Sequence, residues 1–437
     1  NQNMYYVDKT MYLAELEKQP RTLIFIRPRR FGKSLFISMM RAYYDKSKAD
    51  RFDKLFGSLW VGSHPTPLRN HYQVLYLDFS RIGGNIDVLE KEFDSYCCIQ
   101  LNDFIDTYRN DYPKEMVDEF LRAENATRKL NILLNMSRKY DQPLYLIIDE
   151  YDNFTNVVLS EHGEAIYHNM THAAGFYREV FKKFKGMFER IFLTGVSPVT
   201  LDDLTSGFNI GWNISMAPEL DKMLGFSTED VRQMFTYFKE AGQLPADCDI
   251  EAMIAEMKPW YDNYCFAKEC LESDVRVFNC DMVLYYLRNY ISYKHSPEIM
   301  LDPNTKTDYK KLNMLIQLDK LDGDRKGVMM EIIEKGEIAA TLIPSFSANE
   351  MTDPETFPSL LFYYGMLTIK GKYGSMLSLG IPNNNVRMQY YNYILKQYAQ
   401  YKIVNVNKLQ IAFVKMSLDG LWQEPLQYMA DCYKQLS

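Results

Sequence analysis

Four short apolar segments in the first half of the chain constrain its fold more than any other feature. Each is apolar almost throughout and ends in polar or glycine residues: TLIFIR (22–27), YQVLYLDFS (72–80), PLYLIIDE (143–150) and RIFLTGVSP (190–198). Continuous rather than alternating apolarity indicates strands that are buried on both faces. Amphipathic helical segments lie between them, which is the pattern of a parallel sheet covered by helices. We therefore predict an α/β fold, with a weaker fifth strand in GWNISMA (211–217).

The segment after the first predicted strand nearly matches a phosphate-binding loop. RPRRFGKS precedes SLFISMMRAYYD, a predicted amphipathic helix, and differs from the motif G-x-x-x-x-G-K-[ST] because Arg27 replaces the first glycine. Gly32 permits close approach of the backbone, and the N–H groups at the helix start form an anion site. On this pattern Lys33 would reach the β- and γ-phosphates, and Ser34 would help to hold Mg²⁺.

Polar residues also end two of the other predicted strands. Asp149 and Glu150 follow the third strand, where the first acid suits Mg²⁺ and its water and the second suits a base that activates a water molecule. Two carboxylates at one strand end need a cation or solvent, so packing does not explain them. Thr194, at the end of the fourth strand, is a small polar group that could sense a γ-phosphate. Together these residues predict a site for ATP and Mg²⁺.

The sequence resembles the predicted AAA-ATPase-like proteins of bacteria, P-loop ATPases that are often fused to a PD-(D/E)XK nuclease-like domain. The matching segments are YYVDKT (5–10), RPRRFGKS (27–34), LYLDFS (75–80), LIIDEYDNF (146–154), FLTGVSP (192–198), LGFSTEDV (224–231), WYDNYCF (260–266) and LLFYYGMLTI (360–369). They cover nearly the whole chain, and the RPRRFGKS form of the loop is itself typical of the family. The resemblance implies a P-loop NTPase fold of the AAA+/ASCE type, with helices on both faces of the sheet.

The resemblance also implies roles for individual residues. Lys33 and Ser34 take the phosphate and Mg²⁺ roles, Asp149 forms the acidic pair with Glu150, and Glu150, Lys33 and Thr194 are the expected catalytic set. The expected nucleotide-binding residues are Tyr6, Val7, Arg29, Arg30, Phe31, Gly32, Lys33, Ser34 and Leu35. The YYVDKT segment is expected beside the adenine, and the expected metal ligands are Ser34 and Asp149.

The predicted domains are a P-loop ATPase domain (1–222), a helical lid (223–300), a winged-helix-like domain (301–395) and a helical tail (396–437). The first lid helix is predicted in STEDVRQMFTYFKEAG, because Ser227 opens it and Glu229 and Asp230 occupy its first turn. Helical segments without a comparable strand are expected from there to about residue 347. PETFPSLLFYYG then predicts a short helix and MLTIKGKYGSMLSLGIP a hairpin, which is the order of a winged helix.

Three other patterns give weaker signals. We do not expect the nuclease-like domain in this chain, because EMK (256–258) fits its triplet but lies in a helical segment without a strand-borne partner acid. His168 and His172 share a helical spacing without a third metal ligand, so an exposed helix face is expected. Trp260 and Tyr261 are interpreted as core aromatics rather than as a lid contact.

Several alternatives stay open from the sequence. Arg29 and Arg30 could stabilise charge on the transferred phosphoryl group or contact a partner's nucleotide, or they could only raise the local potential. Lys370 and Lys372, which we place in the hairpin turn, are ordinary turn lysines that would also suit a DNA-contacting wing. The first hypothesis is an Mg-dependent ATPase that acts as a nucleotide-driven switch. The second is a nucleotide-gated module that recruits protein or DNA with little or no turnover, and either could assemble with copies of itself.

Composition excludes some other classes of protein. The formal net charge of −7 argues against a protein that coats nucleic acid by bulk electrostatics. The 7 cysteines form no C-x-x-C pair, which fits a reduced cytoplasm. No apolar run approaches the roughly 18 residues that span a bilayer, and NQNMYYVDKT is no signal peptide. We therefore expect a cytoplasmic protein without a membrane partner.

Overall fold

The computed structural model describes most of the chain. The described residues are 5–82, 88–153, 180–181, 183–184, 186–198, 211–273, 276–302, 325–346, 350, 353–399 and 405–436. The chain divides into two compact units, residues 1–383 and 384–437. The predicted pair His168 and His172 lies outside the described residues.

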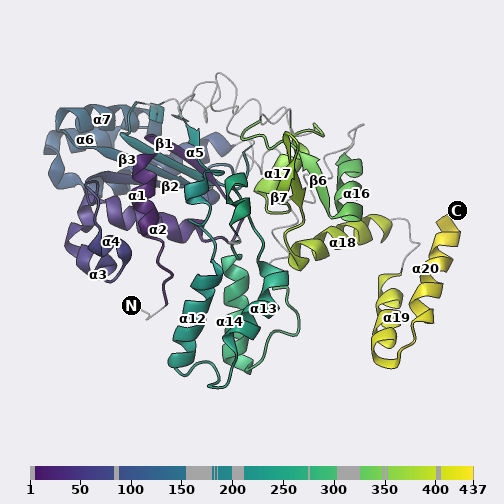
Figure 1. Ribbon diagram of the computed structural model, residues 1–437. Helices are drawn as coiled ribbons and strands as arrows, with labels where there is room; N and C mark the ends of the chain where they lie inside the picture. Colours follow the sequence, from purple (N-terminus) through teal and green to yellow (C-terminus); the bar gives the residue numbers. More distant parts are fainter. Residues whose placement is uncertain are drawn as a thin grey trace. The chain divides into compact units, whose positions relative to one another are not determined.

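A five-stranded parallel sheet forms the centre of the N-terminal half of the first unit (Figure 1). Its strands are β1 (Thr22–Ile26), β2 (Gln73–Asp78), β3 (Leu144–Asp149), β4 (Arg190–Gly195) and β5 (Trp212–Asn213). Their order is β2-β3-β4-β1-β5, and the ladders that join them are parallel. This confirms the predicted α/β class and the five predicted strands, although β5 is only two residues long.

The order of the strands decides which of their ends meet. β1 and β3 are buried at every position, whereas β2, at an edge of the sheet, alternates between buried and half-buried residues. β4 lies between β1 and β3, so the loop that follows β1 is separated from the end of β3 by a single strand. The sheet therefore brings the loop motif, the acidic pair and Thr194 to one edge, where open α/β sheets bind ligands.

Helices cover both faces of this sheet (Figure 1). They are α1 (Met11–Lys18), α2 (Lys33–Tyr44), α3 (Phe52–Phe56), α4 (Trp60–Ser63), α5 (Leu89–Thr107), α6 (Lys114–Arg122) and α7 (Ala126–Lys139). Short 3₁₀ helices are η1 (Lys46–Arg51), η2 (Phe79–Arg81), η4 (Arg109–Asp111), η5 (Pro218–Leu220) and η6 (Lys268–Glu272). α2 contacts β2 and β3, and this packing fixes the helix that starts at the phosphate-loop motif.

Three helices follow the sheet: α12 (Thr228–Glu240), α13 (Ile250–Tyr261) and α14 (Cys280–Tyr293). α12 starts where the sequence predicts, because Ser227 and Asp230 form a reciprocal capping box. The helices share a core of buried apolar side chains that includes Tyr261, with Trp260 packed against it. The interpretation of these two aromatics as core residues is therefore confirmed.

A three-stranded antiparallel sheet, in the order β6-β8-β7, occupies the last part of the first unit. Its elements are α16 (Arg325–Lys335), β6 (Glu337–Ala340), α17 (Phe357–Tyr363), β7 (Thr368–Tyr373) and β8 (Met376–Gly380). The helix and hairpin are as predicted. β6 was not identified from the sequence, because it is only four residues long and so is weaker than the strands of the first sheet. The placement of Lys370 and Lys372 in the turn is wrong, since both lie within β7.

The second unit contains α18 (Asn384–Ala399), α19 (Val406–Asp419) and α20 (Gln423–Leu436), which confirms the predicted helical character of the tail. α19 and α20 contact each other, and Gly420 ends α19 in the left-handed conformation, with φ of 71°. The boundaries predicted at 222/223, 300/301 and 395/396 stay predictions. Among the described residues, no helix combines the length and the apolarity that crossing a membrane requires.

Candidate nucleotide site

The loop between β1 and α2 leads into a helix start of the kind that suits an anion. Gly32 precedes the first residue of α2 with φ of 92°, a conformation that favours glycine, and its carbonyl accepts from the N–H of Phe36 at 3.0 Å. Arg30 is also left-handed, with φ of 68°. The free N–H groups of the first turn and the positive end of the helix dipole therefore face the same cavity as the loop.

Arg27, which replaces the motif glycine, is a structural anchor. Its side chain is 1% exposed and lies between the rings of Phe25 and Phe266, with Cζ 4.4 and 4.1 Å from the ring centroids. Its guanidinium donates to the carbonyls of Ile26, Ser215 and Leu220. Burial lowers the pKa of Arg27 to about 10. The arginine thus fixes the exit of β1 through contacts that a glycine lacks.

Lys33 is buried at the start of α2 and turns back on the loop. Its Nζ donates to the carbonyls of Arg27 and Pro28 at 3.0 and 3.1 Å. Burial lowers the pKa of Lys33, while the carboxylates of Glu150 and Asp149 raise it. An anion at the loop would compensate this buried charge, and the phosphate role of Lys33 stays a prediction.

The start of α2 is joined to the end of β3 by a hydrogen bond. Ser34 Oγ donates to Asp149 Oδ2 at 2.8 Å. Burial raises the pKa of Asp149 to about 6, and the bond from Ser34 opposes this rise. A hydroxyl and a carboxylate are hard oxygen ligands of the kind that Mg²⁺ takes, with substrate phosphates and water completing its coordination. Among the described residues there is no group of three or more His, Cys, Asp or Glu that could hold a metal ion.

Glu150 lines the same cavity in an unusual backbone conformation. Its φ is 51°, in the left-handed region, and its N–H donates to Asp149 Oδ1 at 2.9 Å. For a residue other than glycine this conformation costs on the order of 1 kcal/mol or more, and such strain is common at functional sites. The turn therefore presents the second carboxylate to the cavity beside the first.

Thr194 is placed differently from the other predicted residues. It is 1% exposed, does not line the cavity, and pairs with Phe25 in the sheet. Its carbonyl accepts from the N–H of Tyr151 at 3.1 Å, while its Oγ1 has no hydrogen-bond partner among the described residues. The structure thus brings Lys33, Ser34, Asp149 and Glu150 to one cavity. Thr194 is buried in the sheet and does not line that cavity. Its role as a γ-phosphate sensor stays a prediction.

The phosphate-side cavity has a volume of about 670 Å³. Its lining residues are Arg29, Arg30, Gly32, Lys33, Ser34, Leu35, Tyr76, Asp78, Ser80, Asp149, Glu150 and Asn153. The sequence-based site lacked the contribution of β2, although DFSR was recognisable as a strand end. Asp78 is directly opposite Asp149 in the β2–β3 ladder, so the pairing of these two strands adds a third carboxylate to the cavity.

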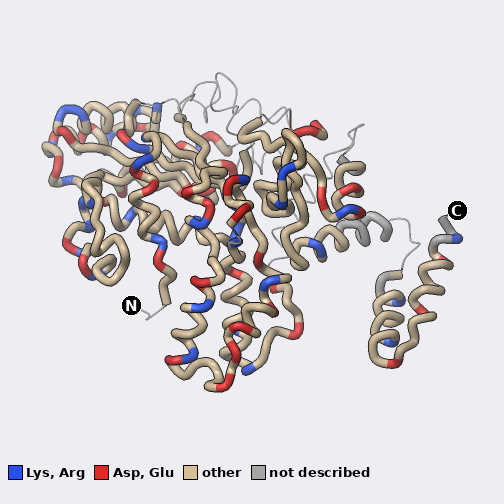
Figure 2. The backbone as a smooth tube through the Cα atoms, in the orientation of Figure 1, with Lys and Arg blue, Asp and Glu red and all other residues tan. Residues whose placement is uncertain are grey.

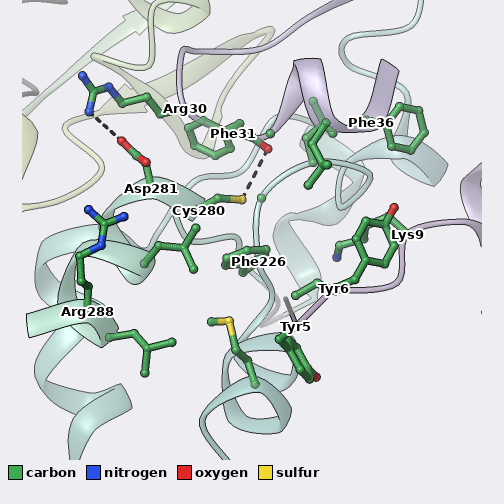
Figure 3. A pocket seen from close by; sticks show the side chains of 18 of the residues that line it. Tyr5, Tyr6, Lys9, Arg30, Phe31, Phe36, Phe226, Cys280, Asp281 and Arg288 are labelled. Carbon is green, nitrogen blue, oxygen red and sulfur yellow. Dashed lines mark hydrogen bonds and ion pairs between the residues drawn. The ribbon is translucent and has the colours of Figure 1, made fainter. Parts of the chain in front are cut away.

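A second cavity, of about 710 Å³, lies between the N-terminal segment, α2, α12 and α14 (Figure 3). Tyr6, Val7 and Phe31 line this cavity. Further apolar side chains in its lining come from α12, α14 and the segment that precedes α12. Arg30, Gly32 and Leu35 line both cavities, which are therefore adjacent. All of the predicted nucleotide-binding residues thus line one or both cavities.

Two ion pairs connect these elements to α12 and α14. Lys9 pairs with Asp230 of α12 and Arg30 pairs with Asp281 of α14, each at 2.7 Å. Figure 3 shows the Arg30 pair at the edge of the second cavity, with Cys280 Sγ directed at the carbonyl of Phe31. Arg30 thus pairs with α14 and lines both cavities, whereas Arg29 lines the phosphate-side cavity. Neither finding shows a contact with a phosphate or with a neighbouring molecule.

Comparison with known proteins agrees with this geometry. Residues 1–205 match the family model described as predicted AAA-ATPase. This part of the chain is therefore similar to the predicted AAA-ATPases. Its loop, its acidic pair and its parallel sheet are those of a P-loop NTPase fold of the AAA+/ASCE type, which confirms the predicted fold class.

The chain is also similar to an uncharacterized protein from the vnfD 5′ region of Azotobacter chroococcum mcd 1. The two are 26% identical over 271 residues, which is 61% of this chain and 46% of the relative, so the chain spans about half the length of that protein. Among solved structures it is similar to the ORC2 protein of Aeropyrum pernix, with a TM-score of 0.37, 12% identity and coverage of 91% and 98% of the two chains. It is also similar to Cdc6p of Pyrobaculum aerophilum, with a TM-score of 0.30 and 12% identity. That comparison covers 86% of this chain and 88% of Cdc6p.

Proposed function

We propose that the chain is an Mg-dependent ATPase that acts as a nucleotide-driven switch. The observation that carries the proposal is the 2.8 Å hydrogen bond between Ser34 and Asp149, next to Glu150 in one cavity. That cavity is polar and adjoins a largely apolar pocket. A nucleoside triphosphate matches this division, because its phosphates suit the helix start and its purine suits the apolar part.

Phosphate binding would use the start of α2 and Lys33. The Lys33 ammonium, now bonded to two loop carbonyls, would exchange these for oxygens of the β- and γ-phosphates. Ser34 and Asp149 would hold Mg²⁺, which when bound neutralises charge that develops on the phosphoryl group. These residues thus fix the triphosphate with its γ-phosphorus near the end of β3.

Hydrolysis would use the carboxylate of Glu150. It accepts a proton from a water molecule as the water oxygen bonds to the γ-phosphorus and the bond from that phosphorus to the β-phosphate oxygen breaks. The products are ADP and phosphate. The left-handed turn at Glu150 supports this role because it directs the second acid, rather than the next residue, into the cavity.

The lid helices supply the switch in this proposal. α12 and α14 line the second cavity. Asp230 of α12 pairs with Lys9, and Asp281 of α14 pairs with Arg30. A ligand that fills the cavity contacts both sides, so its binding energy can bias the position of the helices. Loss of the γ-phosphate changes the charge next to Arg29 and Arg30, which gives hydrolysis a route to the lid.

Two variants test the proposal. Lys33→Ala should weaken ATP binding in calorimetry by at least about tenfold, because a buried phosphate contact is lost. Glu150→Gln should bind ATP normally and abolish phosphate release. Lys54→Ala and Glu119→Gln, at exposed positions outside both cavities, are the matched controls. Unchanged ATP affinity in Lys33→Ala would refute the site, and binding without turnover under all conditions would favour a nucleotide-gated module instead.

Partners belong to the same proposal at a coarser level. Along the described residues of the first unit, Lys and Arg alternate with Asp and Glu, and no segment of the tube is dominated by blue (Figure 2). Lys370 and Lys372 are exposed on β7, which is the part of the chain that we would test for DNA contact. Gel shifts with and without ATP, and sedimentation in both states, measure DNA binding and self-association directly.

A further inference from the structure

Two side chains fasten the turn that carries Glu150 to the end of β4. We call residues 150–153 the acidic turn and residues 194–197 the β4 loop. The N–H of Tyr151 donates to the carbonyl of Thr194 at 3.1 Å, and the Tyr151 hydroxyl donates to the carbonyl of Ser197 at 2.5 Å. The carboxylate of Asp152 accepts from the N–H of Ser197 at 2.6 Å and from that of Val196 at 3.2 Å. The turn and the loop therefore form one hydrogen-bonded unit.

The fit between these segments is close at Gly195. A Cβ on this glycine would lie 2.2 Å from Asp152 Oδ1 and 2.7 Å from Cε1 of Tyr151. No side chain can occupy that space without moving the acidic turn. Asp152 itself is 1% exposed, so its carboxylate is held by the backbone of the β4 loop rather than by solvent.

The same contacts determine where Glu150 lies. On one side, Asp149 is bonded to Ser34 and its Oδ1 accepts from the N–H of Glu150. On the other side, the carbonyl of Glu150 accepts from the N–H of Asn153 at 2.9 Å, and the following residues are fixed to the β4 loop. Glu150 is thus a left-handed residue between two anchored neighbours. Releasing either anchor would let the strained φ relax and would displace the carboxylate.

A residue from the hairpin part of the chain covers this unit. Tyr364 follows α17, and burial raises the pKa of its phenol, as does the carboxylate of Asp152, while Arg29 and a hydrogen bond with the Ser197 side chain oppose the rise. Tyr364 therefore lies against the acidic turn and the β4 loop.

We propose that Asp152 is a positioning residue for ATP hydrolysis, which holds the acidic turn on the β4 loop so that Glu150 faces the attacking water. The proposal rests on the proposed ATPase function. A buried carboxylate is costly unless it is hydrogen-bonded, and here the compensating donors are the backbone N–H groups next to Thr194. The hydrogen bonds of Asp152 thus fix the position of the acidic turn relative to the β4 loop.

The test compares Asp152→Ala and Asp152→Asn with Asp45→Ala, using the full chain. Asp45 is the matched control because it is also a buried aspartate that accepts from a backbone N–H, that of Ser47, and from the Tyr108 hydroxyl, yet it lines neither cavity. Phosphate release at saturating Mg-ATP gives kcat, calorimetry gives the Kd for ATP, and thermal unfolding gives the midpoint. All three quantities are measured for each variant.

We expect Asp152→Ala to lower kcat by about 10- to 100-fold, because small displacements of a catalytic group are costly, with a Kd for ATP within about threefold of wild type. Asp152→Asn keeps one oxygen for the Ser197 N–H and should recover part of the lost kcat. Asp45→Ala should lower the unfolding midpoint without a selective loss of kcat. If Asp152→Ala does not fold, Asp152→Glu, which keeps the charge and shifts the carboxylate by one methylene, replaces it.

A folded Asp152→Ala or Asp152→Glu protein with wild-type kcat would overturn the positioning role. So would a loss of kcat no larger than that in Asp45→Ala at an equal loss of stability. Failure of the proposed function has a different signature: the wild type would show no turnover, or Glu150→Gln would turn over normally. The two failures are therefore distinguishable in one set of measurements.

Discussion

Ser34 and Asp149 lie 115 positions apart in the sequence, yet a 2.8 Å hydrogen bond joins the hydroxyl of one to the carboxylate of the other. The bond links the first turn of α2 to the end of β3 across the position of β4. It places two hard oxygen ligands at the mouth of the phosphate-side cavity. A cation that binds here would therefore contact both the start of α2 and the end of β3.

Replacing Ser34 should separate metal binding from nucleotide binding. Ser34→Ala removes one proposed Mg²⁺ ligand and the hydrogen bond to Asp149, and we expect the Mg²⁺ concentration for half-maximal phosphate release to rise by about tenfold. ATP binding in EDTA should change little, because Lys33 and the helix start remain. Ser63→Ala, at an exposed position, is the control. Equal Mg²⁺ requirements in the two variants would contradict the assignment.

Restoring the motif glycine at position 27 should destabilise the protein. Arg27→Gly leaves a void between two aromatic rings and removes the donors to three buried carbonyls, so we expect a loss of about 3 kcal/mol or more in the free energy of unfolding. The measurement is the denaturant midpoint of the nucleotide-free protein. A midpoint equal to that of wild type would show that the arginine is not an anchor.

The Arg30–Asp281 pair should hold back nucleotide binding. Asp281→Asn leaves Arg30 without this carboxylate at the junction of the two cavities, and its positive charge should then strengthen ATP binding by about two- to fivefold. The effect is modest because both side chains are partly exposed. Calorimetry on Asp281→Asn, Arg30→Gln and the double variant measures it. Weaker ATP binding in Asp281→Asn would reverse our interpretation of the pair.

The stability of the nucleotide-free protein should depend on the pH through Asp152. Burial raises the pKa of Asp152 from 3.8 to about 6, with Glu150 adding to the rise and backbone hydrogen bonds from the β4 loop opposing it. The titratable groups near it are Glu150 in the same turn, Lys33 of α2 and the Tyr364 phenol. Because the folded state binds this proton more tightly, the free energy of unfolding should fall as the pH rises from about 4 to about 6.

The expected size of this pH effect is at most roughly 3 kcal/mol. Urea midpoints between pH 4 and pH 7 measure it, and Asp152→Asn should remove the contribution because an amide does not titrate. Asp45→Asn, the same substitution at a buried aspartate that lines neither cavity, is the control. Asp149, whose pKa is also raised to about 6, titrates over the same range, so part of the slope should remain. If the slope in Asp152→Asn is as steep as in wild type, the titration belongs to Asp149 and other groups and not to Asp152.

The sequence allowed prediction of the local part of this site and not of its tertiary part. The strands, the helix start at Gly32 and the acids at 149–150 could be predicted because apolar runs and strand ends are local patterns. The contribution of Asp78 depends on which strands pair, and the burial of Arg27 depends on Phe266, more than two hundred positions along the chain. The edge strand β6 was missed because four residues carry too little pattern.

The contact between the hairpin part of the chain and the phosphate loop gives the last prediction. Gly365 follows α17 with φ of 76°, and a Cβ on it would lie 2.8 Å from Cγ of Pro28. Gly374, in the β7–β8 turn, has a similar φ of 61°, but a Cβ there would meet nothing within 4 Å. Alanine at either position would be strained by about 1 to 2 kcal/mol in the left-handed conformation. Only alanine at position 365 would also displace the loop, because only there does the Cβ meet Pro28.

We therefore expect Gly365→Ala to lower the unfolding midpoint more than Gly374→Ala does, and to weaken ATP binding by at least about threefold where Gly374→Ala does not. The reason is that Pro28 stands next to Arg27, and both of their carbonyls accept from Lys33. Displacing the proline moves the acceptors that hold the lysine, and with them the phosphate-binding ammonium. Equal ATP affinities in the two variants, measured by calorimetry, would show that the hairpin part of the chain does not act on the loop through this contact.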